Sequence, residues 1–331
     1  MADLPISTQD ETDEGLLFAY ALDGQGGATK IGWPEINAAG DQLKWIHLDF
    51  SNPGSARWLR HASNIDSSIV DALLDNDSRP RSVSHYNGVL VTLRAINTNT
   101  GADPEDMVSI RIWLENNRIV TTRRRRLLTV RSLEQEFQKN SGPKTPGEFL
   151  VRIVDKLSER IDPVIDHLDE QVDQAEERFQ EAHANSYRGE FSAFRRQAMR
   201  LRRFMAPQRE SLETASRLDT PLLNANEKFA LHEAADQVTR HVEDLDLIRE
   251  RAMVAQEELL ARMAQEQNSR MYILAIVAAI FLPLSFLTGL MGMNVAGLPG
   301  TEDPTSFSLL ALLMSGIGVI IVLFFRWKKW L

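Results

Sequence analysis

The sequence predicts a cytoplasmic α/β or α+β domain, followed by long helices and then by two transmembrane helices at the C-terminal end of the chain. Three observations lead to this prediction. Short apolar alternations fill residues 1–145, helical periodicity continues almost unbroken after them, and two long uncharged apolar runs close the sequence. Of the 331 residues, 25% are charged, and nearly all of these precede the apolar runs. The composition therefore describes a soluble body joined to a membrane segment.

The predicted α/β domain covers residues 1–145. Apolar residues alternate in short segments bounded by Gly, Asn, Asp or Pro, a pattern typical of β-strands. The expected strands are residues 16–22, 44–50, 88–96, 107–115 and 118–122. Between the second and the third strand, residues 55–62 and 67–75 are predicted to form helices that begin at serine caps.

Residues 146–225 are predicted to be helical, with breaks near 184–189 and 219–225. From Asn226 onward, apolar residues recur at steps of three and four. They are Leu231, Ala235, Val238, Val242, Leu245, Ile248, Ala252, Ala255, Leu259 and Met263. Neither Pro nor Gly occurs between Asn226 and Leu282, so a single helix of roughly 100 Å is expected over residues 226–291. The simplest interpretation of its apolar stripe is a coiled-coil stalk.

Residues 271–291 and 307–325 are the predicted transmembrane helices. The first run carries no charge and would measure about 31 Å as a helix, close to the thickness of a hydrocarbon core. The connecting loop, residues 292–306, is charged only at Glu302 and Asp303, while Arg262 and Arg270 precede the first run and a basic tail, residues 326–331, follows the second. Basic residues stay on the cytoplasmic side, so both termini are expected there.

One face of the first span carries small, weakly polar or apolar residues at helical spacing. They are Asn268, Met271, Ala275, Ala278, Leu282, Ser285 and Gly289. Two helices cannot enclose a water-filled path, so a transport function requires several copies around an axis, with this face lining the pore. Small residues on a span also serve helix packing, which is the alternative interpretation.

Amide side chains lie at both ends of that face. In a symmetric oligomer, Asn268 and Asn294 would each form a ring of carbonyl oxygens, which suits a hydrated divalent cation. Gly289 and Gly292 would let the chain turn sharply and present Asn294. The alternative is that Asn294 only caps the C-terminus of the helix.

The triplet Gly292, Met293 and Asn294, placed directly after the first of two C-terminal spans, resembles the signature of the CorA family of divalent metal ion transporters. IFLPLSFLTGL before it and RWKKWL at the C-terminal end are similar to that family too. Four further segments resemble its ZntB zinc-transporter branch. They are IHLDFSNPGSARWL at 46–59, SRPR at 78–81, FMAPQR at 204–209 and NVAGLPG after the first two residues of the triplet.

The resemblance implies a funnel-shaped homopentamer in the inner membrane of a bacterium, with the triplet as selectivity filter. It implies Zn²⁺ as the transported substrate, with coupling to protons, and no tightly bound cofactor. Many magnesium-type members carry an aromatic residue where this chain has Met291, which favours the zinc branch. A magnesium, cobalt or nickel channel is the alternative. In a pentamer, Glu302 and Asp303 would attract cations to the outer mouth.

Other charged groups have the spacing or composition of binding sites. His167 with Glu170 and His232 with Asp236 have the helical spacing of metal ligands, although such pairs are more often solvated surface. The run RRRR at 123–126 has the composition of an anionic-lipid or nucleic-acid patch, but it directly follows a strand and fits a solvated turn.

A net charge of −9 argues against a general nucleic-acid partner. No Walker loop, GxSxG or HExxH motif occurs, so no enzymatic activity is expected. A function of a different class stays open: a membrane-anchored oligomeric sensor or scaffold, in which the two spans only tether the chain.

Overall fold

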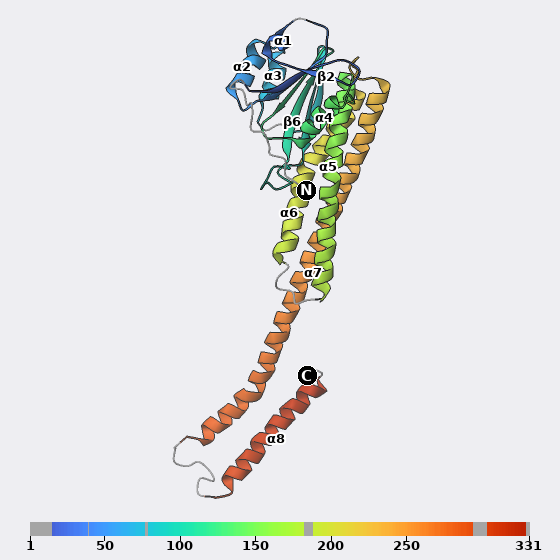
Figure 1. The fold of residues 1–331 in the computed structure, drawn as a ribbon. Coiled ribbons are helices and arrows are strands. Elements are labelled where there is room, and N and C mark those ends of the chain that lie inside the picture. The colour runs from blue at the N-terminus through green and yellow to red at the C-terminus, as the bar shows by residue number, and fades with distance from the viewer. Residues whose placement is uncertain (1–14, 39, 77–78, 182–187, 294–302, 329–331) are drawn as a thin grey trace. The chain divides into compact units, whose positions relative to one another are not determined.

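The computed structural model describes residues 15–38, 40–76, 79–181, 188–293 and 303–328 (Figure 1). The chain divides into two compact units, residues 1–256 and 257–331. The boundary falls inside one long helix, α7, which contributes to both units. The first unit contains the sheet and the helical region, and the second contains the apolar helices.

A seven-stranded sheet forms the centre of the first unit, with strand order β2-β1-β3-β7-β6-β5-β4. Its strands are β1 (Leu16–Leu22), β2 (Ala28–Ile31), β3 (Lys44–Asp49), β4 (Arg81–His85), β5 (Gly88–Ala95), β6 (Val108–Leu114) and β7 (Arg118–Arg123). Only the pair β3 and β7 is parallel; the other neighbours are antiparallel. The five predicted strands are confirmed. The two that were missed, β2 and β4, are the edge strands, which bury one face or less and so lack a clear apolar alternation.

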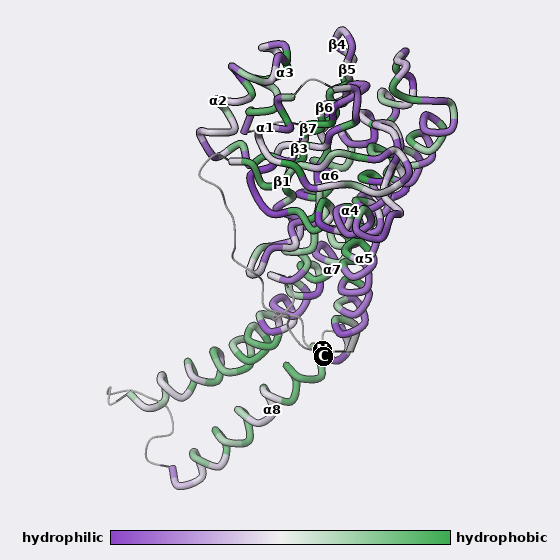
Figure 2. The backbone as a smooth tube through the Cα atoms, turned by 45° about the horizontal axis from the view of Figure 1, so that its top comes forward, coloured by the Kyte–Doolittle hydropathy of each residue, from purple (hydrophilic) through white to green (hydrophobic). Residues whose placement is uncertain are grey.

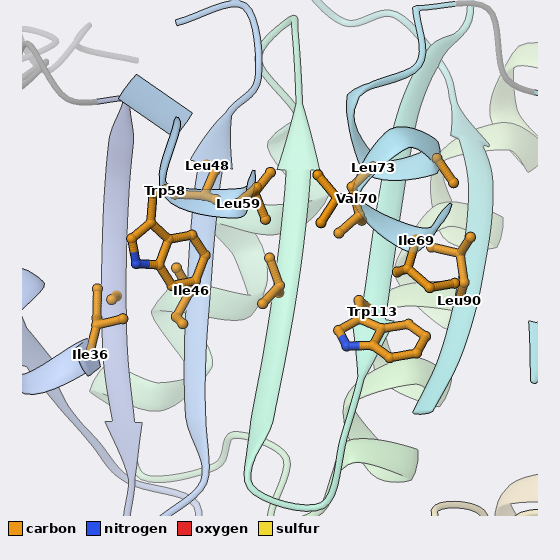
Figure 3. Close-up of a cluster of buried hydrophobic side chains, with 13 residues drawn as sticks. Ile36, Ile46, Leu48, Trp58, Leu59, Ile69, Val70, Leu73, Leu90 and Trp113 are labelled. Atoms are coloured by element: carbon orange, nitrogen blue, oxygen red, sulfur yellow. The ribbon is translucent and has the colours of Figure 1, made fainter. Parts of the chain in front are cut away.

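One face of the sheet is covered by α1 (Trp33–Asn37), α2 (Pro53–His61) and α3 (Ser67–Leu74). Trp58 and Leu59 of α2 pack with Ile46 and Leu48 of β3 (Figure 3), and Leu73 of α3 belongs to the same buried cluster. The predicted serine caps were wrong. Asn52 Oδ1 accepts the Gly54 amide at 2.8 Å and Asp66 Oδ1 accepts the Ser68 amide at 2.8 Å, so the caps lie before those serines.

The opposite face of the sheet is covered by α4 (Leu128–Gln138), α5 (Pro146–Glu181) and α6 (Arg188–Arg217). Trp45, which points away from α2, packs against Phe137 of α4 and Phe149 of α5, with ring centroids 5.8 and 5.0 Å apart. On α6, Gln208 Oε1 accepts the backbone amide of Arg94 on β5 at 2.7 Å. The sheet is therefore enclosed by helices on both sides.

Helix α7 (Ala225–Met291) is continuous over 67 residues; the absence of Pro and Gly predicted this as far as Leu282, and the helix continues through Pro283 and Gly289. Its apolar stripe is buried from Leu231 to Leu259. Within the first unit, polar contacts tie α7 to α5: Asp162 accepts from Gln237 at 3.2 Å, and Arg251 donates to Asp169 at 2.9 Å. On α6, Arg202 forms an ion pair with Asp246 at 2.7 Å. Helices α5 and α6 run beside α7, so in this unit the stripe is covered within one chain and needs no coiled coil between copies.

This burial predicts a difference between two leucines on α7. Leu245 is fully buried, whereas Leu247 is 55% exposed. We expect Leu245→Ala to lower the free energy of unfolding by about 2 to 5 kcal/mol, because it leaves a cavity, and Leu247→Ala to change it by less than about 0.5 kcal/mol. Thermal unfolding of the full-length protein in detergent measures both. Equal losses would instead place Leu247 against another copy of the chain.

Candidate ion pathway

The second unit contains two helices that are long and apolar enough to cross a membrane, the C-terminal part of α7 and α8 (Ser306–Trp327). Figure 2 shows that the residues of both are mainly hydrophobic, whereas many residues along α5 are hydrophilic. The second helix begins one residue earlier and ends two residues later than the sequence predicted.

One face of the apolar part of α7 is half-buried. The residues with this partial burial are Ile276, Ile280, Pro283, Leu284 and Leu287, at steps of one, three and four. On α8, a corresponding stripe is half-buried or buried: Ser306, Leu310, Met314, Ile317, Gly318, Ile321 and Phe325. The two helices run side by side (Figure 1), and the partial burial of one stripe on each indicates that these stripes face each other.

The predicted pore face lies on the other side of α7. Every residue of that set is exposed in the single chain, including Met271 at 61% and Leu282 at 75%. At 3.6 residues per turn, the mean direction of this face differs by roughly 160° from that of the face against α8. A single chain therefore leaves this face uncovered on the side away from its own second span, together with larger exposed residues beside it such as Phe281 and Phe286.

Helix α7 ends at the start of the triplet. The Gly292 amide donates to the Thr288 carbonyl at 2.9 Å, and a Cβ at Gly292 would lie 3.0 Å from that same oxygen. Glycine is therefore favoured at 292 by its own helix, whereas a Cβ at Gly289 would meet nothing within 4 Å. Met293 is exposed, and Asn294 lies outside the described residues.

Asp303 stands just before α8, and its predicted partner Glu302 lies outside the described residues. The Asp303 Oδ1 atom accepts from the Thr305 amide at 2.9 Å and from the Thr305 hydroxyl at 2.8 Å. These hydrogen bonds, the backbone one first, hold the pKa of the Asp303 carboxyl below its usual value. Asp303 thus both orders the start of α8 and stays ionised at neutral pH.

The histidine pairs lie on the surface of the first unit. His167 and Glu170 are exposed on α5, where Glu170 accepts from Gln174 at 3.2 Å, and His232 and Asp236 are exposed on α7. Among the described residues, no group of three or more His, Cys, Asp or Glu side chains is arranged to hold a metal ion. Neither pair therefore meets a third ligand in the part of the chain that the structure describes.

Comparison with known proteins identifies the family. Residues 40–329 match the model described as "CorA-like Mg2+ transporter protein". The chain belongs to the CorA family. Among its relatives, "Divalent cation transporter CmaX" of Pseudomonas aeruginosa is 34% identical over 324 residues, which cover 96% of this chain and 98% of that protein. "Zinc transport protein ZntB" of Pectobacterium carotovorum is 34% identical over 321 residues, 96% of each chain.

Solved structures agree with this assignment. The full-length CmaX protein superposes with a TM-score of 0.85 at 34% identity, covering 98% of this chain and 100% of that one. The CorA magnesium transporter from Methanocaldococcus jannaschii gives a TM-score of 0.79 at 19% identity, over 95% of this chain and 99% of that one, and shows the shared fold.

These findings confirm the predicted family and fold class. The protein is a divalent cation transporter of the CorA/ZntB type and not an enzyme. Its family and its two apolar C-terminal helices indicate a protein of the inner membrane.

Proposed function

We propose that the protein carries Zn²⁺ across the inner membrane of a bacterium, through a pore formed by α7 from five copies of the chain with their termini in the cytoplasm. The supporting observation is the uncovered face of α7, which lies opposite the face packed against α8. An arrangement with α7 inside and α8 outside covers that face with water and neighbouring copies, and turns α8 toward lipid.

The proposed path begins at Asn268 and follows Met271, Ala275, Ala278, Leu282, Ser285 and Gly289 to the filter residues Gly292, Met293 and Asn294. Small side chains leave room for an ion that keeps its hydration shell. Neutral amide oxygens at the two ends accept hydrogen bonds from that shell without trapping the ion. Carboxylates in the same place would hold the ion too tightly.

Zinc is proposed over magnesium on two grounds. The ZntB relatives carry zinc transport in their names and align over nearly the whole chain, and Met291 replaces the aromatic residue expected in magnesium-type members. A magnesium, cobalt or nickel channel is the second candidate, supported by the magnesium transporters in the family description and among the solved structures.

Metal flux into liposomes tests the proposal. Purified full-length protein is reconstituted into liposomes that contain a metal-sensitive dye, and influx is compared for Zn²⁺, Ni²⁺, Co²⁺ and Mg²⁺. We expect Zn²⁺ influx well above that of protein-free liposomes. Faster Mg²⁺ than Zn²⁺ influx would favour the second candidate, and no flux of any metal would leave the sensor or scaffold interpretation.

A prediction concerns the loop carboxylates. In a pentamer, Glu302 and Asp303 would surround the outer mouth with carboxylates and concentrate divalent cations there. We expect the double variant Glu302→Gln and Asp303→Asn to slow influx at low ionic strength and to have little effect at about 0.5 M salt, where charges are screened within a few ångströms. Because the pKa of Asp303 is lowered, its carboxylate stays charged and attracts cations from neutral pH down to that pKa. Below it, the charge and the attraction are lost.

The control keeps the turn before α8. Because Asp303 also accepts two hydrogen bonds from Thr305, asparagine is chosen there, since its side-chain carbonyl can accept the same bonds. Equal influx by variant and wild type at both salt concentrations would show that the loop charges serve orientation only.

Proton coupling gives a further prediction. Residues 271–291 and 306–327 contain no Asp, Glu or His, the groups that usually relay protons at membrane depth. The pKa of Asp303 is lowered, so a gradient between pH 5 and 8 changes its charge little. We therefore expect any stimulation by a pH gradient to act through groups outside the bilayer, either Glu302 of the loop or the carboxylates and histidines of the cytoplasmic part.

The measurement is Zn²⁺ influx with and without a pH gradient in Ser285→Ala and Asp303→Asn. Both variants should keep the ratio of the two rates found for the wild type. A Ser285→Ala protein that transports Zn²⁺ but no longer responds to the gradient would place the coupling inside the bilayer.

A further inference from the structure

A strongly basic pocket lies in the first unit, away from the proposed ion path in the sequence. Its volume is about 520 Å³, within the range of small-molecule sites. Five arginines line it, and we call it the arginine pocket: Arg94, Arg124, Arg125, Arg200 and Arg203. Two residues of the RRRR run, Arg124 and Arg125, thus take part in a concave site rather than a solvated turn alone.

The sheet topology explains why these residues meet. Strands β3, β7 and β5 run in the same direction, since β3 and β7 are parallel and β6 is antiparallel to both β7 and β5. Their carboxyl ends therefore share one edge of the sheet. Phe50 follows β3, Arg124 follows β7 and Arg94 lies near the end of β5. In open α/β sheets, ligands bind outside the carboxyl ends of parallel strands, and β3 and β7 are the parallel pair of this sheet.

Helix α6 supplies the other wall of the arginine pocket. Arg200 and Arg203 are three residues apart, so they lie on the same face of the helix. Gln208 of the same helix holds the backbone amide of Arg94, at 2.7 Å, which fixes this face of α6 against β5. The pocket is thus built on a strand and a helix that are joined by a buried hydrogen bond.

Positive charge exceeds negative charge in the arginine pocket. Its lining contains two carboxylates, Glu105 and Asp106, and both lie near Arg200, at 3.8 and 3.9 Å. Within the part of the chain that the structure describes, Arg124, Arg125 and Arg203 form no ion pair. All three side chains are exposed, so they are available to a ligand.

Two buried arginines, Arg94 and Arg111, add to the excess of positive charge. Arg94 is only 9% exposed, and its guanidinium lies 4.4 Å from the centre of the Phe204 ring. Arg111 is fully buried, with its guanidinium 4.5 Å from the ring centre of Phe50, and its Nε and Nη1 atoms have no hydrogen-bond partner among the described residues.

Burial, followed by the nearby charge of Arg94, lowers the pKa of Arg111 to about 10, so it remains a cation at neutral pH. Arg111 Nη2 donates to the backbone carbonyl of Asp75, which leaves its two other guanidinium nitrogens without a partner among the described residues, and burying a cation whose donors are only partly paired is costly. An anion in front of Phe50 would offset this cost, and two phenylalanine rings would provide apolar contact for the organic part of a ligand.

We propose that the arginine pocket binds a soluble, phosphorylated small molecule that carries at least two phosphate charges. Guanidinium groups pair with phosphate oxygens through two parallel hydrogen bonds, a geometry that several arginines at one site favour. A concave pocket fits a small molecule better than a nucleic acid, whose binding the net charge of −9 also opposes.

Binding to the full-length protein tests this proposal. Pyrophosphate and ATP are titrated by calorimetry into the protein in an uncharged detergent, at constant ionic strength. We expect saturable binding by the wild type, and at least about tenfold weaker binding by the double variant Arg124→Gln and Arg125→Gln, because two charge-assisted contacts are lost. Both side chains are exposed, so the substitutions leave the core of the fold intact.

The matched control removes the same charge outside the pocket. Arg126 and Arg131 are exposed and do not line it, so the double variant Arg126→Gln and Arg131→Gln should bind within about twofold of the wild type. Equal weakening by both double variants would reveal general electrostatic attraction and overturn the proposal. So would the absence of saturable binding of either probe by the wild type.

A last arm separates soluble ligands from lipid headgroups. The titration is repeated in micelles that contain phosphatidylglycerol, which should leave the affinity for pyrophosphate unchanged. If the lipid competes with pyrophosphate, the pocket binds lipid headgroups, and the proposal of a soluble ligand is overturned. Because binding is measured without metal flux, the result is independent of whether the protein transports Zn²⁺.

Discussion

Replacing Asn294 with alanine should abolish Zn²⁺ influx while leaving the oligomer intact. In the proposed pentamer, this change removes a whole ring of carbonyl oxygens at the outer end of the path. The hydration shell of the ion then loses its acceptors, and small apolar side chains cannot replace them. Influx into liposomes should fall to the level of protein-free vesicles, while size-exclusion chromatography shows the wild-type assembly.

The matched variant is Asn294→Gln, which keeps the amide and should retain part of the influx. Normal influx by Asn294→Ala would instead show that Asn294 only caps the C-terminus of α7. Helix α7 ends at Met291, and the Gly292 amide makes its last helical hydrogen bond. The described residues of this segment stop at Met293, so these two variants decide between the filter and the cap.

Apolar residues along the sequence were sufficient to predict the well-buried elements. The central strands β3, β5, β6 and β7 are flanked on both sides, and their apolar residues identified them. The length of α7 followed from the lack of Pro and Gly over residues 226–282. Its apolar stripe was also correct, but the sequence did not identify what covers it, because a stripe at steps of three and four shows only that something packs on it. Helices α5 and α6 of the same chain supply that partner in the first unit.

Contacts between distant parts of the sequence could not be predicted in the same way. The half-buried face of α7 against α8 depends on how two uniformly apolar helices rotate, and neither has enough polar residues to fix that rotation by pattern alone. The arginine pocket joins residues near 94, 124 and 200, which meet only because three strands end at one edge and α6 packs beside it. The RRRR run was a visible signal, but nothing in it indicated Arg200 or Arg203.

Single cysteines in α7 should separate the proposed pore face from the face against α8. The sequence contains no cysteine, so each introduced thiol is the only one in the chain. Ala278→Cys and Ser285→Cys lie on the proposed pore face, and Ile280→Cys and Leu284→Cys lie on the half-buried face. We expect a water-soluble, positively charged thiol reagent to block Zn²⁺ influx almost completely in the first pair, because a bulky cation in the path excludes the ion both by size and by charge.

The same reagent should leave the second pair unaffected, since contact with α8 keeps water from those thiols. All four variants are first assayed without reagent, and only those with near wild-type influx are compared. If the reagent blocks influx at 280 and 284 but not at 278 and 285, the ion path lies on the opposite face of α7. The small residues would then serve helix packing. Block at 278 and 285 alone would support a path along the face that a single chain leaves uncovered, and would explain why transport requires several copies of α7 around one axis.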